Sequence, residues 1–376
     1  MSRILEEEEE AARNPRAGAR PVAVELLEPR RSVRTLATRR RRGEWARTSS
    51  AGRAPTTSPM NGRVSLGTVN VHLPAPPRPL RWVAPVAYAA ALSAYMWRDG
   101  VPVGRERLLL WIVLGLLALS TANVGGWFRG VLFEWLPLAL VLAVYDVLRG
   151  HADGLLFSAW YRPQIEADAF LFDGTVPTVW LQQKLWDASH VQWYDYASWG
   201  VYVSYFVATY LVAGLLWFFA RDRFRRYVGC VALLAGMAYA TFALFPAAPP
   251  WLASRSGELE YTTRLIGPIS AHIPFLSLSF EGLFERGWEY ANPVAAVPSL
   301  HAAYTLLVTL FLWRATRWGR PLLALYPAAM AFALVYTAEH YLVDILLGWA
   351  YTLFAIWVVG RIANGLGRRT RATVPR

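Results

Sequence analysis

Residues 321–360 read PLLALYPAAMAFALVYTAEHYLVDILLGWAYTLFAIWVVG. Two apolar runs, 322–338 and 341–360, flank a short polar segment that contains His340, and Asp344 follows just inside the second run. A helix that crosses a bilayer needs about 20 predominantly apolar residues, so the two runs predict neighbouring membrane helices. Ionisable groups inside a membrane segment are costly and are generally kept for function, which makes His340 and Asp344 candidate functional residues.

The same alternation of apolar and charged segments continues through most of the chain. The 376 residues are 55% hydrophobic and 17% charged, and the apolar residues are gathered in uncharged blocks. A soluble protein of this length would not carry so many such blocks, so we expect an all-α, polytopic integral membrane protein. The eight transmembrane helices expected after Pro79 cover residues 82–97, 107–122, 131–148, 198–219, 227–245, 299–313, 322–338 and 341–360.

The net charge of +12 has a membrane explanation rather than a nucleic-acid one. Arginines occupy both tails and the short stretches between apolar runs, as expected of segments that face the cytoplasm and anionic lipid. The arginines after spans four, six and eight include Arg221, Arg223, Arg225, Arg226, Arg314, Arg317, Arg320, Arg361, Arg368, Arg369 and Arg371. We therefore expect both termini in the cytoplasm, residence in the plasma membrane, and His301 and His340 at the extracytoplasmic face.

The two ends of the chain differ from the membrane region. Residues 1–80 contain an acidic run at 6–10, a basic run at 39–42 and many small or polar residues. Such a segment cannot bury enough apolar surface to offset its ordering entropy, so we expect a disordered cytoplasmic tail. It lacks the apolar stretch of a secretory signal peptide. Residues 363–376 are expected to form a second, basic cytoplasmic tail.

Two long connections, 149–197 and 246–298, are expected outside the cytoplasm. Connections longer than about 12–15 residues are usually functional or disordered. Residues 177–189 have an apolar side typical of an amphipathic helix that lies on a membrane surface. That side consists of Val179, Leu181, Leu185 and Trp186. A re-entrant segment or a plain loop cap fits the same pattern equally well.

The expected chemistry depends on three residues near the ends of apolar runs, namely His301, His340 and Asp344. Pro298 suits the first turn of a helix, Ser299 can cap that helix, and free backbone N–H groups there attract an anion beside His301. His340 and Asp344 are four residues apart and share one face of a helix, so Asp344 can hold one ring nitrogen and leave the other as a nucleophile. The alternatives are a histidine satisfied at the interface and a structural His–Asp pair.

A further polar group ends the third span. Tyr145, Asp146 and Arg149 are expected on the same side of the membrane as the histidines. Arg149 can bind phosphate oxygens, and Asp146 can pair with Arg149 or form a hydrogen bond with a polar head group. An ordinary arginine at a membrane boundary is the alternative.

These segments resemble the type-2 phosphatidic acid phosphatase superfamily, whose second and third motifs are similar to PSLH at 298–301 and to HxxxD at 340–344. The closer resemblance is to the branch that contains fungal inositol phosphorylceramide synthase, on PSLHA, on HYLVD and on the Tyr-Asp-Arg element before them. The similarity spans roughly residues 130–360. The two histidine motifs together are fairly specific, whereas the Tyr-Asp-Arg element alone is weak.

The resemblance implies a six-helix phosphatase-type catalytic core at 129–362, preceded by two accessory transmembrane helices within 81–128. It also implies that His340 attacks phosphorus while Asp344 orients it. His301 would protonate the leaving oxygen and then activate the acceptor. This scheme requires no metal and no cofactor.

The chain departs from the superfamily pattern in two places. Phosphatases of the superfamily carry Ser-Arg shortly before the histidine of the third motif, whereas Ala333 and Leu334 stand here. The basic first motif that ends in Arg-Pro is not evident before span six. The charges that bind phosphate would then come from Arg149, Arg255 or Arg264, with Arg162 a weaker candidate. These departures favour the phosphotransferase branch.

We therefore expect a lipid phosphotransferase that acts on a membrane lipid with a phosphate group, with inositol or another hydroxyl compound as acceptor. A phosphatase that hydrolyses a phospholipid or a polyprenyl phosphate is the alternative. A lipid transporter would need polar residues in the middle of several spans, and spans four, five and seven are nearly free of them. Cys230 is the single cysteine, so no internal disulfide and no zinc-type cysteine spacing are expected.

Overall fold

The computed structural model describes residues 80–100, 102, 105–151, 157–273 and 292–372. The chain divides into two units, Met1–Asn70 and Val71–Arg376, and all described residues belong to the second. The expected disordered tail lies outside the described residues, apart from its last residue. The described residues are arranged in helices without a named strand, which confirms the all-α class.

Four segments in the described ranges are long and apolar enough to cross a membrane. They are Val124–Leu148, the helix α8 (Trp193–Phe219), the helix α9 (Arg221–Leu244) and the part Leu342–Gly365 of α15 (Leu342–Ala372). Shorter apolar helices, α13 (Leu300–Leu312) and α14 (Arg320–Tyr336), form where spans six and seven were predicted. Helices α2 (Leu80–Asp99) and α3 (Arg105–Leu119) form where the first two were predicted. The count of eight spans stays a prediction.

The third predicted span is not one regular helix. It consists of α4 (Val124–Gly130), a π-helical turn (Val131–Trp135) and α5 (Leu136–His151). Glu134 in the π-helical turn forms ion pairs with Arg221 and Arg225 and accepts a hydrogen bond from the indole of Trp217. Two of the arginines predicted to lie between spans four and five thus belong to α9 and neutralise a carboxylate on a neighbouring span.

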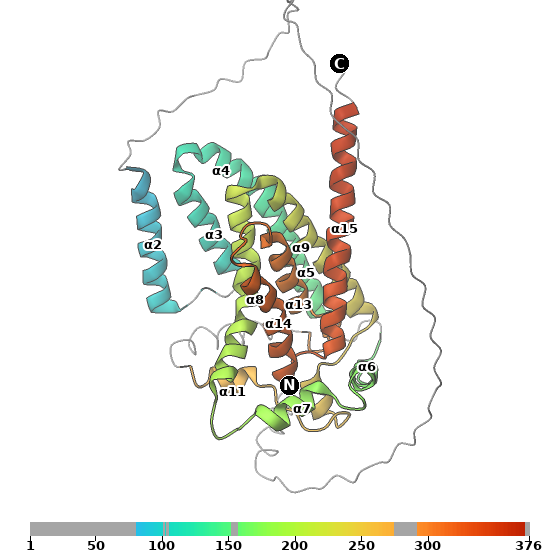
Figure 1. Ribbon diagram of the computed structural model, residues 1–376. Helices are drawn as coiled ribbons and strands as arrows, with labels where there is room; N and C mark the ends of the chain where they lie inside the picture. The colour runs from blue at the N-terminus through green and yellow to red at the C-terminus, as the bar shows by residue number, and fades with distance from the viewer. Residues whose placement is uncertain (1–79, 101, 103–104, 152–156, 274–291, 373–376) are drawn as a thin grey trace, which may run out of the picture. The chain divides into compact units, whose positions relative to one another are not determined.

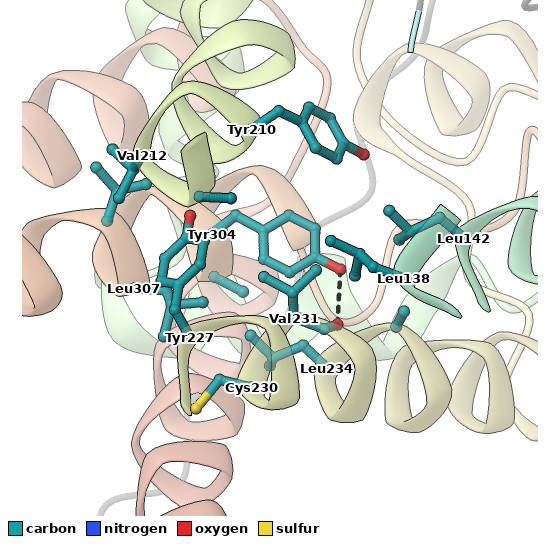
Figure 2. Close-up of a cluster of buried hydrophobic side chains, with 14 of the residues drawn as sticks. Leu138, Leu142, Tyr210, Val212, Tyr227, Cys230, Val231, Leu234, Tyr304 and Leu307 are labelled. Carbon is teal, nitrogen blue, oxygen red and sulfur yellow. Dashed lines mark hydrogen bonds between the residues drawn. The ribbon is translucent and has the colours of Figure 1, made fainter. Parts of the chain in front are cut away.

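Helix α13 lies at the centre of the bundle, in contact with α8, α9, α14 and α15. Its inner residues are almost entirely apolar or small, as expected of a helix surrounded on most sides by other helices. Figure 2 shows part of this core, in which the Tyr304 hydroxyl donates to the backbone carbonyl of Val231 on α9 at 3.2 Å. The hydrogen bond satisfies a buried polar group within an apolar cluster.

Short helices cover one end of the bundle. These are α6 (Arg162–Leu171), α7 (Pro177–Leu185), α10 (Pro250–Arg255) and α11 (Ile266–Ser270). Figure 1 shows α6, α7 and α11 together at this end, where α6 contacts α15, α7 contacts α14 and α11 contacts α8. Isolated parallel bridges join Trp160 to Ala247 and Ala247 to Ala295 beneath them. The long connections are therefore folded against the bundle.

Helix α7 confirms the helix predicted within 177–189, with its apolar side turned toward the protein. Val179 is buried, while Leu181, Leu185 and Trp186 pack against a cluster formed by α8, α11 and α14. Gln182 on the same side donates to the backbone carbonyls of Thr263 and Tyr336 at 2.9 and 2.8 Å. These bonds hold α7 over the end of α14.

Candidate active site

His301 lies in the first turn of α13, against aromatic rings of α8. Its ring stacks on Tyr202, with 5.0 Å between ring centroids and 24° between planes, and lies 4.2 Å from the ring of Tyr205. Ring stacking restricts the rotation of an imidazole, so His301 is held in a defined direction. That direction brings its ring centroid to 5.6 Å from the ring centroid of His340.

The start of α13 explains why His301 reaches this position. Ser299 is the N-cap, and its hydroxyl accepts the backbone N–H of Ala302 at 3.3 Å. The predicted capping role of Ser299 is therefore confirmed. Pro298 lies just before the N-cap and not in the first turn of the helix. A helix that begins at Leu300 places His301 among the N–H groups that have no partner within the helix.

His340 lies in a turn between α14 and α15, whereas the sequence analysis placed it on a helix. The backbone N–H groups of Glu339 and His340 both donate to the carbonyl of Leu334, at 3.0 and 3.2 Å. Ala338 in this turn has a φ of 62°, in the left-handed region that a residue with a Cβ rarely adopts. The turn directs His340 back toward α13.

His340 and Asp344 are nevertheless close to each other, as predicted. The Nδ1 atom of His340 lies 3.4 Å from Oδ2 of Asp344, which is longer than an ordinary hydrogen bond but short enough for charge attraction. The same Oδ2 accepts the backbone N–H of Tyr341 at 3.0 Å, which fixes the carboxylate. Asp344 is fully buried and His340 is nearly so. The arrangement can orient the His340 ring with its Nε2 atom left for chemistry.

Arg264 is the candidate cation that the structure ties to this turn. Its guanidinium binds both carboxylate oxygens of Glu339, at 2.7 and 3.1 Å, and Glu339 directly precedes His340. Burial lowers the pKa of Arg264, but the Glu339 carboxylate raises it more, with a smaller contribution from Tyr202, so the net pKa lies above its usual range. Arg264 is thus a permanent positive charge beside the histidine turn.

Trp251 connects the two candidate arginines of the second long connection. Arg264 lies over its ring at 4.9 Å and Arg255, an exposed residue, at 5.2 Å. The backbone N–H of Trp251 donates to the carbonyl of Ala338 at 3.2 Å, so α10 also holds the turn that carries His340. Both arginines are thus connected through Trp251 to the turn that carries His340.

The remaining candidates lie elsewhere or outside the described side chains. Tyr145 is buried in the core cluster and lines an apolar groove between α5 and α9, and Asp146 is partly buried on α5. The backbone of Arg149 belongs to α5, but its side chain lies outside the described residues. Arg162 is exposed and pairs with Glu258 at 3.2 Å. The contribution of these residues to a head-group site stays a prediction.

Several residues around the histidines were not predicted from the sequence. Tyr202 and Tyr205 belong to a row of uncharged, hydroxyl-bearing residues along one side of the apolar helix α8, from Ser198 to Thr209. This helical spacing was a usable signal. Glu339 and Asp168 had no comparable signal, because their partners lie far away in the sequence. No group of three or more His, Cys, Asp or Glu side chains in the described ranges is placed to hold a metal ion.

Comparisons with known proteins identify the family of the chain. A family described as the PAP2 superfamily matches residues 169–358, which is half of the chain and includes all three candidate catalytic residues. The phosphoinositol dihydroceramide synthase of Bacteroides thetaiotaomicron is 29% identical over 158 residues, covering 40% of this chain and 50% of that protein. The chain thus spans about half the length of this curated relative. No solved structure matches the chain.

Proposed function

The chain belongs to the PAP2 superfamily, and on that premise we propose that it is an integral-membrane lipid phosphotransferase that works through a phosphohistidine. The observation that carries the proposal is the convergence of His301, His340 and Asp344, which come from two different helix starts. Ring centroids 5.6 Å apart place the two imidazoles side by side in one site. A nucleophile and a proton donor that act on the same phosphate must lie this close to each other, which supports their joint role.

Each residue has a defined role in the proposed reaction. The Nε2 atom of His340 attacks phosphorus, a P–N bond forms, and the bond from phosphorus to the leaving oxygen breaks. Protonated His301 gives its proton to that oxygen. Neutral His301 then takes the proton of an acceptor hydroxyl, whose oxygen attacks phosphorus and releases His340. Asp344 stabilises the positive charge on His340 throughout. Arg264 is proposed to bind phosphate oxygens from the side of Glu339, with Ser299 and Arg255 nearby.

We propose a phosphoinositol head group as the transferred group and a lipid hydroxyl as the acceptor, in place of inositol as the acceptor expected from the sequence. The support is the name of the bacterial relative, which combines phosphoinositol with dihydroceramide. The alanine and leucine at positions 333 and 334, in place of the Ser-Arg of superfamily phosphatases, point in the same direction. Hydrolysis of a phospholipid or polyprenyl phosphate needs the same residues with water as acceptor, so the acceptor distinguishes the two activities.

The proposed reaction takes place at the extracytoplasmic face of the membrane. Arginines cluster in the first turns of α9 and at or just before the start of α14, and the turn that carries His340 lies at the other end of α14. Positive charge marks the cytoplasmic side of a membrane protein. We therefore assign the histidines and the short helices α6, α7, α10 and α11 to the extracytoplasmic side. Both termini are proposed to be cytoplasmic, and the plasma membrane is the proposed location.

The test is turnover of a labelled donor by the purified, full-length protein in detergent. Phosphatidylinositol labelled in its head group is supplied with dihydroceramide, with another lipid alcohol, or alone. A new labelled lipid that requires the acceptor supports the transferase, and released inositol phosphate without an acceptor supports the phosphatase. His340→Ala should abolish both products, whereas His272→Ala, an exposed histidine near α11, should retain them. Wild-type turnover in His340→Ala would exclude the phosphohistidine.

A further inference from the structure

Helix α6 places a buried carboxylate at the start of α15. The two carboxylate oxygens of Asp168 accept the backbone N–H groups of Leu342 and Val343, both at 2.9 Å. The preceding N–H, that of Tyr341, is accepted by Asp344. The first N–H groups of a helix have no partner within the helix, and a carboxylate there also interacts favourably with the helix dipole. Two carboxylates from distant parts of the chain thus share one helix start.

Helix α6 is anchored so that this contact is kept. Arg162 at its start pairs with Glu258, and Trp160 just before it exchanges backbone hydrogen bonds with Pro246 and Ala248. Asp168 itself has no exposed surface. Burying a carboxylate is costly unless it is hydrogen-bonded. Asp168 therefore depends on its bonds to the two backbone amides, and these bonds hold the amides in position.

The two amides belong to the residues directly between His340 and Asp344. If the first turn of α15 moves, the Asp344 carboxylate moves relative to the His340 ring, because the turn carries Asp344 whereas His340 lies before it. Resting on the proposed function, we infer that Asp168 is a positioning residue that fixes the His340–Asp344 pair through the first turn of α15. The residue lies one position before the segment matched by the family, so the inference concerns a part of this chain outside that match.

Turnover of phosphatidylinositol by Asp168→Ala and Asp168→Asn tests the inference. Asp168→Ala removes both acceptors and should lower kcat about 100-fold, with KM for the donor changed less than about twofold, since misplacement affects the reacting geometry more than binding. Asp168→Asn keeps one carbonyl acceptor and should recover part of kcat. Glu166→Gln removes an exposed carboxylate from the same helix and should match wild type. Wild-type kcat in Asp168→Ala overturns the inference, as does loss of folded protein in both Asp168 variants.

A second measurement does not depend on turnover. In protein labelled with ¹⁵N-histidine, the His340 ring signals are identified by their loss in His340→Asn. Asp168→Ala should shift them toward the tautomer mixture seen in Asp344→Asn, and Asp168→Asn should shift them less. Unchanged His340 signals in Asp168→Ala overturn the positioning role. If the wild-type protein neither transfers a head group nor hydrolyses a phospholipid, the proposed function fails. The His340 ring signals then still decide whether Asp168 positions His340.

Discussion

The backbone N–H of Ser299 donates to the backbone carbonyl of Asp344 at 3.0 Å. One hydrogen bond therefore joins the segment that carries His301 to the segment that carries Asp344. Gly348, one turn further along α15, allows this approach, because a Cβ there would lie 2.4 Å from the carbonyl oxygen of Ser299. Thr352 adds a hydrogen bond to the carbonyl of Ala303 at 2.9 Å. The two histidine motifs thus form one rigid unit.

Gly348→Ala should separate these helices and impair the site. The added methyl group would clash with the backbone carbonyl of Ser299, which cannot move away without a shift of the backbone. Overpacking of this kind typically costs about 1–3 kcal/mol. We expect a lower Tm and a fall in kcat of at least about 10-fold. Gly360→Ala is the matched control on the same helix, since a Cβ there has nothing within 4 Å. A Tm and kcat for Gly348→Ala equal to those of Gly360→Ala would contradict the rigid-unit interpretation.

Asp344→Asn should lower kcat about 100- to 10,000-fold while KM for the donor stays close to wild type. The amide preserves the shape of the side chain but cannot stabilise a positive His340 ring. Steady-state kinetics of purified protein measure both constants. Asp222→Asn, an exposed carboxylate on α9, serves as the control for charge removal. A rise in KM at unchanged kcat would instead place Asp344 in substrate binding.

Arg264→Lys should reduce kcat/KM about 10- to 100-fold, because lysine keeps the charge but cannot make the paired contacts of a guanidinium. The measurement is donor-dependent turnover, compared with Arg226→Lys, which changes an exposed arginine of α9. Identical kinetics for the two variants would remove Arg264 from the phosphate site.

Stability between pH 4 and 6.5 should depend on Asp168. Burial raises the pKa of its carboxyl to about 6 from about 3.8, although the N–H groups of Leu342 and Val343 lower it in part. A folded pKa above the unfolded pKa contributes stability that is complete below about pH 4 and is lost as the pH rises through 6. The loss is on the order of 3 kcal/mol. Thermal unfolding in detergent should show a smaller decline of Tm over this range in Asp168→Asn than in wild type, and parallel declines would refute the assignment.

Cysteine labelling tests the proposed orientation. Cys230 is 1% exposed, so its replacement by alanine gives a background without thiols at little risk of perturbing the surface. In that background, Glu260→Cys should react with a membrane-impermeant maleimide on intact cells, and Trp318→Cys only after permeabilisation. Both positions are exposed in the structure. The reverse pattern would invert the topology and place the histidines in the cytoplasm.

Much of the helical layout was predictable because hydropathy is a local property. The predicted spans 299–313 and 322–338 agree with α13 and α14 to within about two residues at each end. Helix α8 begins at Trp193, earlier than predicted, because Gln192 and Asp195 form a reciprocal cap that extends the helix beyond its apolar part. Helix α15 continues to Ala372, past the apolar run. Apolar runs therefore located these helices, while caps and polar extensions set their ends.

The candidate site was predictable only in part. Polar residues near the ends of apolar runs identified three of the candidates, His301, His340 and Asp344. The capping chemistry of serine identified Ser299. The left-handed Ala338 that turns His340 out of a helix had no visible signal, because alanine has no special preference for that conformation. Arg264 was one of several candidate cations until its ion pair with Glu339 distinguished it.

Membrane spans and the two histidine motifs at their ends could be predicted from the sequence, because both depend on the order of residues along a short stretch. The groups that surround the histidines became known only from the packing of the helices. Tyr202 beside His301, Arg264 beside Glu339 and Asp168 beneath the first turn of α15 are contacts between segments far apart in the chain. Such contacts depend on how helices pack, which no local pattern encodes.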